Sequence, residues 1–207
     1  MRTAIVVSTL CAVALSGCAV GQKFNYSDSS INVGSVGTGR SAAVAVLDQR
    51  TYIKNGDKPE SFVGLSRGGY GNPFDVATRS GASMASDMAT SITNALQARG
   101  IKTEAVAVHP ADGPEGARQV LVRTGSDRLR LFTLNEWKTD TMVRTGLNFN
   151  VTLDVLDRTG TALARSQISG KEVSGSSIVS AEKDAKAWFA AKVAELLRDD
   201  AVAKALE

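Results

Sequence analysis

The spacing of hydrophobic and polar residues predicts strands alternating with helices along the first two thirds of the chain. Residues 42–47 form a continuous apolar run, which favours a strand covered on both faces. Between residues 75 and 99, apolar side chains recur every four positions, which predicts a helix with one apolar stripe that ends at Gly100. Similar patterns predict a strand over 101–108, a short helix over 114–124 and a strand over 128–137.

The pattern changes in the last third of the chain. Apolar and polar residues alternate strictly over 147–155, which predicts a strand with one solvent-exposed face. Turn residues and a second strand over 162–169 complete an antiparallel hairpin, and a C-terminal helix is expected from about Ser180. We therefore predict a single α/β (α+β) domain over 41–207. In this domain a β-α-β-α-β unit precedes the hairpin, and the C-terminal helix packs on a mixed sheet.

Two segments, residues 18–40 and 51–73, lack a regular spacing of apolar residues. Residues 18–40 are rich in Gly, Ser and Asn, which predicts a flexible tether with little fixed structure. Residues 51–73 are polar and interrupted by glycines and prolines, and they are too long for a routine connection. We interpret them as an irregular connection or as a mobile contact loop with Arg67, Tyr70 and Phe74 at its tip. Nucleotide binding there is disfavoured, because neither the Walker nor the dinucleotide glycine pattern is present.

The N-terminal segment has the pattern of an export signal. The apolar run over 3–15 is shorter than the ~20 residues that span a bilayer, so we interpret residues 1–17 as a cleaved signal peptide. The run ends in a box that is typical of bacterial lipoproteins: Leu15, Ser16, Gly17 and Cys18.

Cys18 is the predicted lipidation site. The small residues before it give a peptidase access to the backbone, and its thiol accepts a diacylglyceryl group. One acyl chain is only a marginal anchor, whereas the two or three chains of bacterial lipoproteins hold a protein on the membrane. Ala19 stands where an aspartate would retain such a protein in the inner membrane. The sequence therefore predicts the periplasmic face of the outer membrane in a Gram-negative bacterium.

Composition excludes several classes of function. Removal of residues 1–17 leaves 190 of the 207 residues and a net charge of about +2, which is too balanced to argue for nucleic acid. Cys11 belongs to the signal and Cys18 takes lipid, so we expect no disulfide, thiol nucleophile or cysteine metal site. With a single histidine, a zinc site would need mainly carboxylates, so neither a metal nor a cofactor is expected.

The candidate catalytic residues lack the motifs that would support them. His109 precedes Pro110 in a predicted turn and is not flanked by a hydroxyl and an acid in the sequence. Glu136, Asp140 and Asp154 could supply paired carboxylates of the glycosidase kind, but no cluster of aromatic residues accompanies them. Trp137 ends the predicted third strand, where it is a core residue, a rim residue or a partner contact. We therefore expect a protein that is not an enzyme.

The chain resembles the YajG-type family of Gram-negative outer-membrane lipoproteins. The resemblance rests on four features: the box ending in Cys18, the strand AAVAVLDQR, the helix over 84–96 followed by the residues ARGI at 98–101, and the strand pair LRLFTLNEW and GLNFNVTLDVLD. It implies no catalytic residues.

From these observations we expect a lipid-anchored, non-catalytic interaction or assembly module that faces the periplasm. Its partner would be another envelope protein or a second copy, held by the sheet edge, the Gly-rich segment or the hairpin at Trp137. The alternatives are an accessory carrier of a lipid or glycan for an envelope transport system and, less favoured, an envelope hydrolase.

Overall fold

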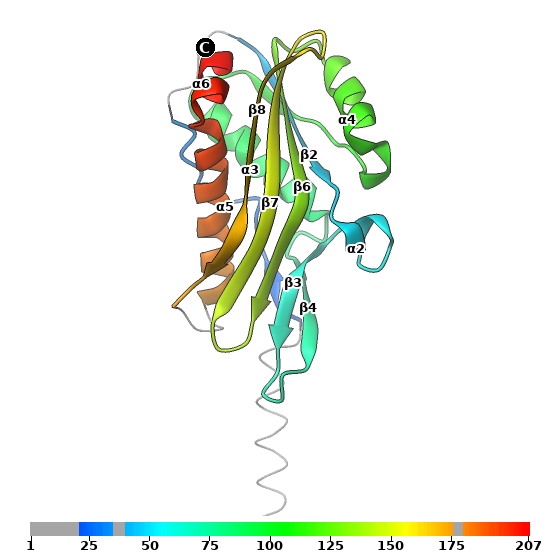
Figure 1. Ribbon diagram of the computed structural model, residues 1–207, viewed down its shortest axis with the longest axis vertical. Helices are drawn as coiled ribbons and strands as arrows, with labels where there is room; N and C mark the ends of the chain where they lie inside the picture. The colour runs from blue at the N-terminus through cyan, green and yellow to red at the C-terminus, as the bar shows by residue number, and fades with distance from the viewer. Residues whose placement is uncertain (1–20, 35–39, 176–179) are drawn as a thin grey trace, which may run out of the picture.

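The computed structural model describes residues 21–34, 40–175 and 180–207. Figure 1 shows a sheet that runs along the long axis of the molecule, with helices on both of its faces. The described strands are β1 (Lys23–Phe24), β2 (Ala42–Asp48), β3 (Phe62–Arg67), β4 (Pro73–Thr78), β5 (Thr103–Ala105), β6 (Arg128–Thr141), β7 (Thr145–Asp157) and β8 (Ala162–Val173).

The long strand β6 organises the sheet. Its first half pairs in parallel with β2, which pairs in turn with β5. Its second half pairs in parallel with β3, which continues into β4 and β1. A register shift between Leu134 and Glu136 separates the two halves. On its other side β6 pairs antiparallel with β7 along its whole length, and β8 follows β7.

The helices form two unequal layers. α3, α5 and α6 pack on one face of the sheet, and most of the hydrophobic core lies between them and the sheet. α4 packs over a smaller hydrophobic cluster on the opposite face. The described helices are α2 (Thr51–Lys54), α3 (Met84–Gln97), the 3-10 turn η1 (Pro110–Asp112), α4 (Gly113–Val122), α5 (Ala181–Leu197) and α6 (Asp200–Leu206).

Strand β2 has the two buried faces that its continuous apolar run predicts. All seven of its residues are buried. Val44 and Val46 belong to the larger cluster, which includes α3, whereas Ala45 and Leu47 face the smaller cluster under α4. The predicted α+β architecture is confirmed, with the predicted hairpin as β7–β8 and the C-terminal helix as α5.

The prediction of an irregular connection over 51–73 is wrong. This stretch contains α2 and β3, and together with β4 it forms a hairpin. The helix predicted from residue 75 begins only at Met84, where the Ser83 side chain accepts a hydrogen bond from the Ser86 N–H. Gly64 explains part of the failure: a Cβ there would lie 2.8 Å from the Thr139 backbone nitrogen, so the glycine reflects a close β3–β6 approach and not a loop.

The described part of the predicted tether is also folded. Phe24, Tyr26, Ile31 and Val33 are buried in the main core. β1 pairs with β4, and the Asn25 N–H donates to Glu182 Oε1 at 2.9 Å. The expectation of little fixed structure is therefore wrong over these residues. Widely spaced apolar side chains carry no periodic signal, yet here they fill the space between α3 and α5. Residues 18–20 and 35–39 lie outside the described residues.

Candidate interaction surfaces

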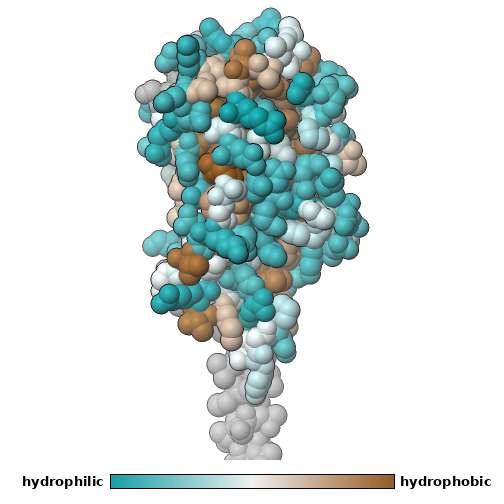
Figure 2. Space-filling view, viewed as in Figure 1, coloured by the Kyte–Doolittle hydropathy of each residue, from teal (hydrophilic) through white to brown (hydrophobic). Residues whose placement is uncertain are grey.

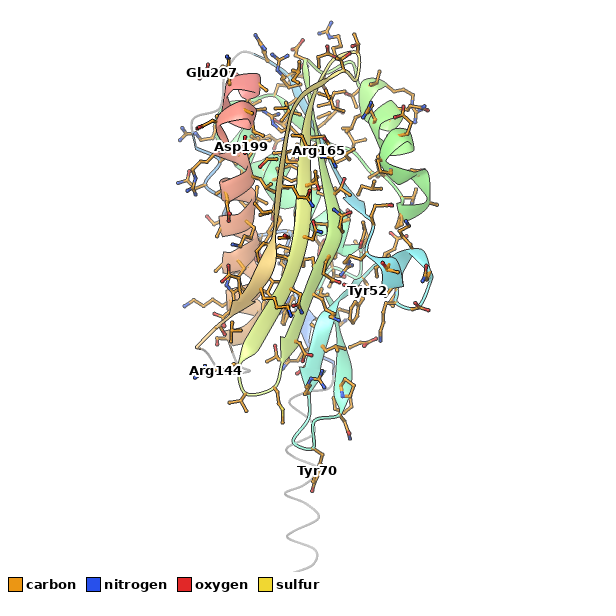
Figure 3. All side chains as sticks on the ribbon, viewed as in Figure 1. Tyr52, Tyr70, Arg144, Arg165, Asp199 and Glu207 are labelled. Atoms are coloured by element: carbon orange, nitrogen blue, oxygen red, sulfur yellow. The ribbon has the colours of Figure 1, made fainter. Side chains whose placement is uncertain are left out.

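The β3–β4 hairpin carries the three contact residues that the sequence suggested for this segment. Arg67 forms a bidentate ion pair with Asp140 of β6, with Nε–Oδ1 and Nη2–Oδ2 distances of 2.7 and 2.6 Å. The Asp140 carboxylate raises the pKa of Arg67. Phe74 is half-buried beside Gly68. Tyr70 is 90% exposed at the tip, as Figure 3 shows, so of the three only Tyr70 is a free contact residue.

Trp137 is a core residue and not a surface contact. Its side chain is 1% exposed, and its Nε1 donates to the Tyr26 hydroxyl at 3.0 Å. Tyr26, Trp137 and Phe189 form mutual edge-to-face contacts with ring centroids 5.6 to 6.4 Å apart. Burial raises the pKa of Tyr26, and its hydroxyl stays protonated. The partner-contact interpretation of Trp137 is wrong.

A buried ion pair next to Trp137 escaped the sequence-based prediction. Arg50 and Asp48 are 0% and 2% exposed, and the guanidinium binds both carboxylate oxygens at 2.9 and 2.7 Å. Arg50 Nη1 also donates to the Trp137 carbonyl at 2.9 Å. Burial alone would lower the pKa of Arg50, but the Asp48 carboxylate outweighs it and the pKa lies above its ordinary value. The available signal was a pair of charges directly after the apolar run of β2.

The pair is extended by Tyr52 on α2. Arg50 lies over the Tyr52 ring at 5.3 Å, and the Tyr52 hydroxyl donates to Glu136 Oε1 at 2.7 Å. Burial and this carboxylate together raise the pKa of Tyr52. Glu136 follows the register shift in β6, so the network joins α2 to the point where β6 passes from β2 to β3.

The structure does not bring the candidate catalytic residues together. Glu136 binds Tyr52, Asp140 binds Arg67, and Asp154 lies 3.7 Å from Arg165. His109 precedes η1 and lines a groove of about 350 Å³ beside α3. Within the described residues there is no group of three or more His, Cys, Asp and Glu side chains that could hold a metal ion.

The hollows of the described domain are shallow or filled. A space inside the apolar core, lined by Trp137 and Phe189 among others, has a volume of only about 10 Å³. A polar hollow of about 290 Å³ lies on the sheet face beside α4, where Lys54, Arg118 and Arg165 are among its lining residues. An apolar ligand would need a much larger dry cavity than the one in the core.

Strand β8 is the longest sheet edge in the described part of the chain. Its twelve residues pair with β7 alone, so its outer backbone groups have no strand partner. Side chains of one face, such as Ile168, are half-buried, and those of the other face, such as Gln167, are exposed. Lys192 of α5 binds Glu172 at 2.9 Å and lies 4.5 Å from the Phe149 ring centroid, which fixes α5 on the half-buried face.

Cys18, with Leu15, Ser16 and Gly17, lies outside the described residues, as does the whole signal peptide over 1–17. Among the helices that the structure describes, none is long and apolar enough to cross a bilayer.

Neither a family model nor a curated protein matches the sequence. Solved structures do match. Protein XCC0632 from Xanthomonas campestris, assigned to the DUF330 family, has a TM-score of 0.52 at 13% identity, covering 90% of this chain and 94% of that one. A PelC dodecamer from Paraburkholderia phytofirmans has a TM-score of 0.43 at 14% identity, covering 80% and 96%.

Lipoprotein GNA1162 from Neisseria meningitidis has a TM-score of 0.30 at 15% identity, covering 76% of this chain and 99% of that one. The structural neighbours thus include a DUF330 protein and a bacterial lipoprotein, and none of them shows the YajG-type family. At these identities the comparison establishes fold alone. The chain has the fold of the Xanthomonas protein.

Proposed function

We propose that this chain is a lipid-anchored, non-catalytic assembly protein of the bacterial envelope, which joins a partner through the open edge of β8. The partner strand belongs to a second copy or to another envelope protein. The observation that carries the proposal is the length of this edge: twelve residues extend about 40 Å and pair on one side only in the described structure. Natural sheets rarely leave so long an edge without protection or partner.

The chemistry of β8 suits strand addition. Main-chain N–H and C=O groups along the edge supply affinity, and alternating side chains select the partner and its register. Arg165 and Lys171 are exposed on the outer face. Such cations discourage random edge pairing. They also favour a partner strand with acidic residues at the facing positions.

The anchor in this proposal is Cys18, acylated after removal of residues 1–17. The lipoprotein box supports it, and the YajG-type resemblance supports the outer membrane as the location. Cys18→Ser should abolish acylation and release the protein from the membrane fraction, because the acyl chains provide the main hold. Intact mass and fractionation of cells measure both effects. If the serine variant remains membrane-bound, the anchor assignment is wrong.

The alternatives receive less support. A lipid carrier needs an apolar cavity, and the space beside Trp137 and Phe189 in the apolar core measures only about 10 Å³. A hydrolase needs a free base or acid, and Glu136 and Asp140 are held by Tyr52 and Arg67. The polar hollow beside α4 could accept a glycan, but no aromatic residue is among those that line it.

Single proline substitutions at Arg165, Ser166, Ile168 and Ser169 should separate assembly from folding. Backbone N–H groups in a strand point alternately to its two sides, so two of the four prolines remove a hydrogen bond to β7. Those two should cost about 1–3 kcal/mol of unfolding free energy through an unsatisfied partner. The other two should leave stability near wild type but remove partner capture. Thermal unfolding and photo-crosslinking in cells from position Gln167 measure the two effects.

A crosslinker at Glu115, exposed on α4, is the matched control for the crosslinker at Gln167. The proposal predicts a defined product from Gln167 and none from Glu115. Equal products from both positions, or capture that survives all four prolines, would contradict a β8 interface.

A further inference from the structure

Exposed hydrophobic side chains gather at one end of the molecule. The described residues include five large hydrophobic side chains that are exposed, and four of them lie at the end where the β3–β4 and β6–β7 turns meet. We call this the hairpin end, and its apolar members are Tyr70, Met142, Val143 and Val173, exposed by 90%, 48%, 77% and 67%. Figure 2 shows hydrophobic side chains on this end of the surface.

The sheet register explains why residues so distant in sequence meet there. Ser66 pairs with Thr141, so the turns that follow β3 and β6 extend beyond the sheet on the same side. Val173 pairs with Gly146, one residue after β7 begins at Thr145, which places the end of β8 beside the β6–β7 turn. Leu163, the fifth exposed hydrophobic residue, lies at the other end of β8.

The chain also enters the domain from the hairpin end. β1 is parallel to β4, with Lys23 opposite Ala77, and the Ala77 N–H donates to the Gln22 carbonyl at 3.3 Å. β4 runs away from the hairpin tip, so the residues before Lys23 lead back towards it. Three residue steps separate Gly21 from Cys18, and they span at most about 11 Å. The position of Gly21 therefore limits how far the proposed acylation site can lie from the hairpin end.

The charges at this end are predominantly positive. Lys23, Arg144 and Lys171 are exposed and have no acidic partner among the described residues. Three nearby carboxylates are neutralised in ion pairs: Asp75 with Lys58, Asp140 with Arg67 and Glu172 with Lys192. Figure 3 shows Arg144 and Tyr70 at the same end of the molecule. An apolar patch flanked by unpaired cations is complementary to an anionic phospholipid surface.

We propose that the hairpin end docks on the phospholipid surface that holds the acyl chains of Cys18. This inference rests on the proposed lipidation and adds an orientation to it. The β3–β4 and β6–β7 turns both contact the membrane, so the domain has a fixed orientation relative to the bilayer. Tyr70, Met142 and Val143 enter the interface between the headgroups and the acyl chains, where aromatic rings with a polar tip accumulate. Lys23, Arg144 and Lys171 bind lipid phosphates.

Docking at the membrane can be measured on the full acylated chain. The mature sequence contains no cysteine except Cys18, so a fluorophore can be attached at Val143→Cys or, as the matched control, at Leu163→Cys. The acylated protein is placed in vesicles of phosphatidylethanolamine and phosphatidylglycerol that contain nitroxide-labelled lipid. We expect at least about three-fold more quenching at position 143 than at position 163, because only the former enters the interface.

A charge variant tests the electrostatic part. Replacing Lys23, Arg144 and Lys171 by Gln should lower the docked-to-undocked ratio about 100-fold, since each cation near an anionic surface contributes about a five-fold factor. Three exposed basic residues at the opposite end serve as control, and their replacement by Gln should leave quenching unchanged: Arg99, Lys102 and Arg123.

The outcomes distinguish this inference from the proposed anchor. Intact mass shows first whether Cys18 is acylated, and a protein without lipid overturns the anchor itself. An acylated, vesicle-bound protein with equal quenching at 143 and 163 overturns the docking while the anchor stands. A blue-shifted label at 143 that lipid does not quench also overturns it, because the hairpin end then contacts protein, such as a second copy.

Discussion

Asp48→Ala is expected to lower the free energy of unfolding by about 3–5 kcal/mol, because it leaves a buried guanidinium without its counter-charge. Arg50 is 0% exposed and holds both Asp48 oxygens. Its remaining donor contact is the Trp137 carbonyl at 2.9 Å. The loss of the pair should therefore also weaken the attachment of α2 to β6, because Arg50 contacts Tyr52, and Tyr52 binds Glu136 next to the register shift.

Urea unfolding followed by tryptophan fluorescence measures this effect. Asp75→Ala is the matched control, because Asp75 binds Lys58 through both oxygens at 2.7 Å but lies at the surface. Exposed pairs contribute about 0–1 kcal/mol. Similar losses for the two variants would show that burial of the Arg50 pair has no energetic consequence.

Arg130→Met is expected to raise the free energy of unfolding by about 1–3 kcal/mol, because it removes a buried cation that has no partner among the described residues. Arg130 is 2% exposed, lies between Val44 and Val155 in the sheet, and its Nε and Nη1 make no hydrogen bond. Burial lowers its pKa to about 10. Methionine has a similar length and no polar atom to bury.

The sign of the pH dependence follows from that lowered pKa. The unfolded chain holds the Arg130 proton up to its ordinary pKa, so the penalty is fully present below about pH 10 and falls as pH rises above it. At neutral pH the whole penalty applies, so equilibrium unfolding there should show the largest gain for methionine. Arg123→Met, exposed after α4, is the control and should change stability by less than about 0.5 kcal/mol. A destabilised Arg130→Met variant would mean that the guanidinium has a partner in solution.

The hairpin end and the β8 edge give the two proposals a common geometry. β6, β7 and β8 run along the long axis of the molecule, and their shared turn end carries Met142 and Val143 (Figure 1). With that end on the membrane, β8 runs roughly perpendicular to the bilayer surface. A second copy anchored in the same leaflet can then approach the open edge of β8 within the plane of the membrane, which suits strand pairing between the two copies.

Local pattern was sufficient where a single element buries its own apolar face. The run over 42–47 predicts a strand with two buried faces, and β2 has them. Strict alternation over 147–155 predicts β7, and helical spacing predicts the body of α3. In each of these elements, the spacing of apolar residues within a short stretch of sequence is enough to indicate which residues are buried.

Elements that depend on distant partners could not be predicted in the same way. The β3–β4 hairpin has the glycines of a loop, but Gly64 is required by the close approach of Thr139 from β6. Tyr26 lies in a segment whose composition predicts a tether. It is buried because it packs against Trp137 and Phe189, which belong to elements distant in the sequence. The same contacts placed Trp137 in the core, where the sequence had left its role open.

The sequence by itself determined the order of the main strands and helices and predicted where a lipidation box lies, because periodicity and short motifs are local. Only the tertiary structure decided which surfaces are free. It buried Trp137, paired Arg67 with Asp140, left β8 open and brought Tyr70 to the end where Val143 is exposed. The physical reason is that strand register joins residues far apart in the chain, and no local pattern encodes that pairing.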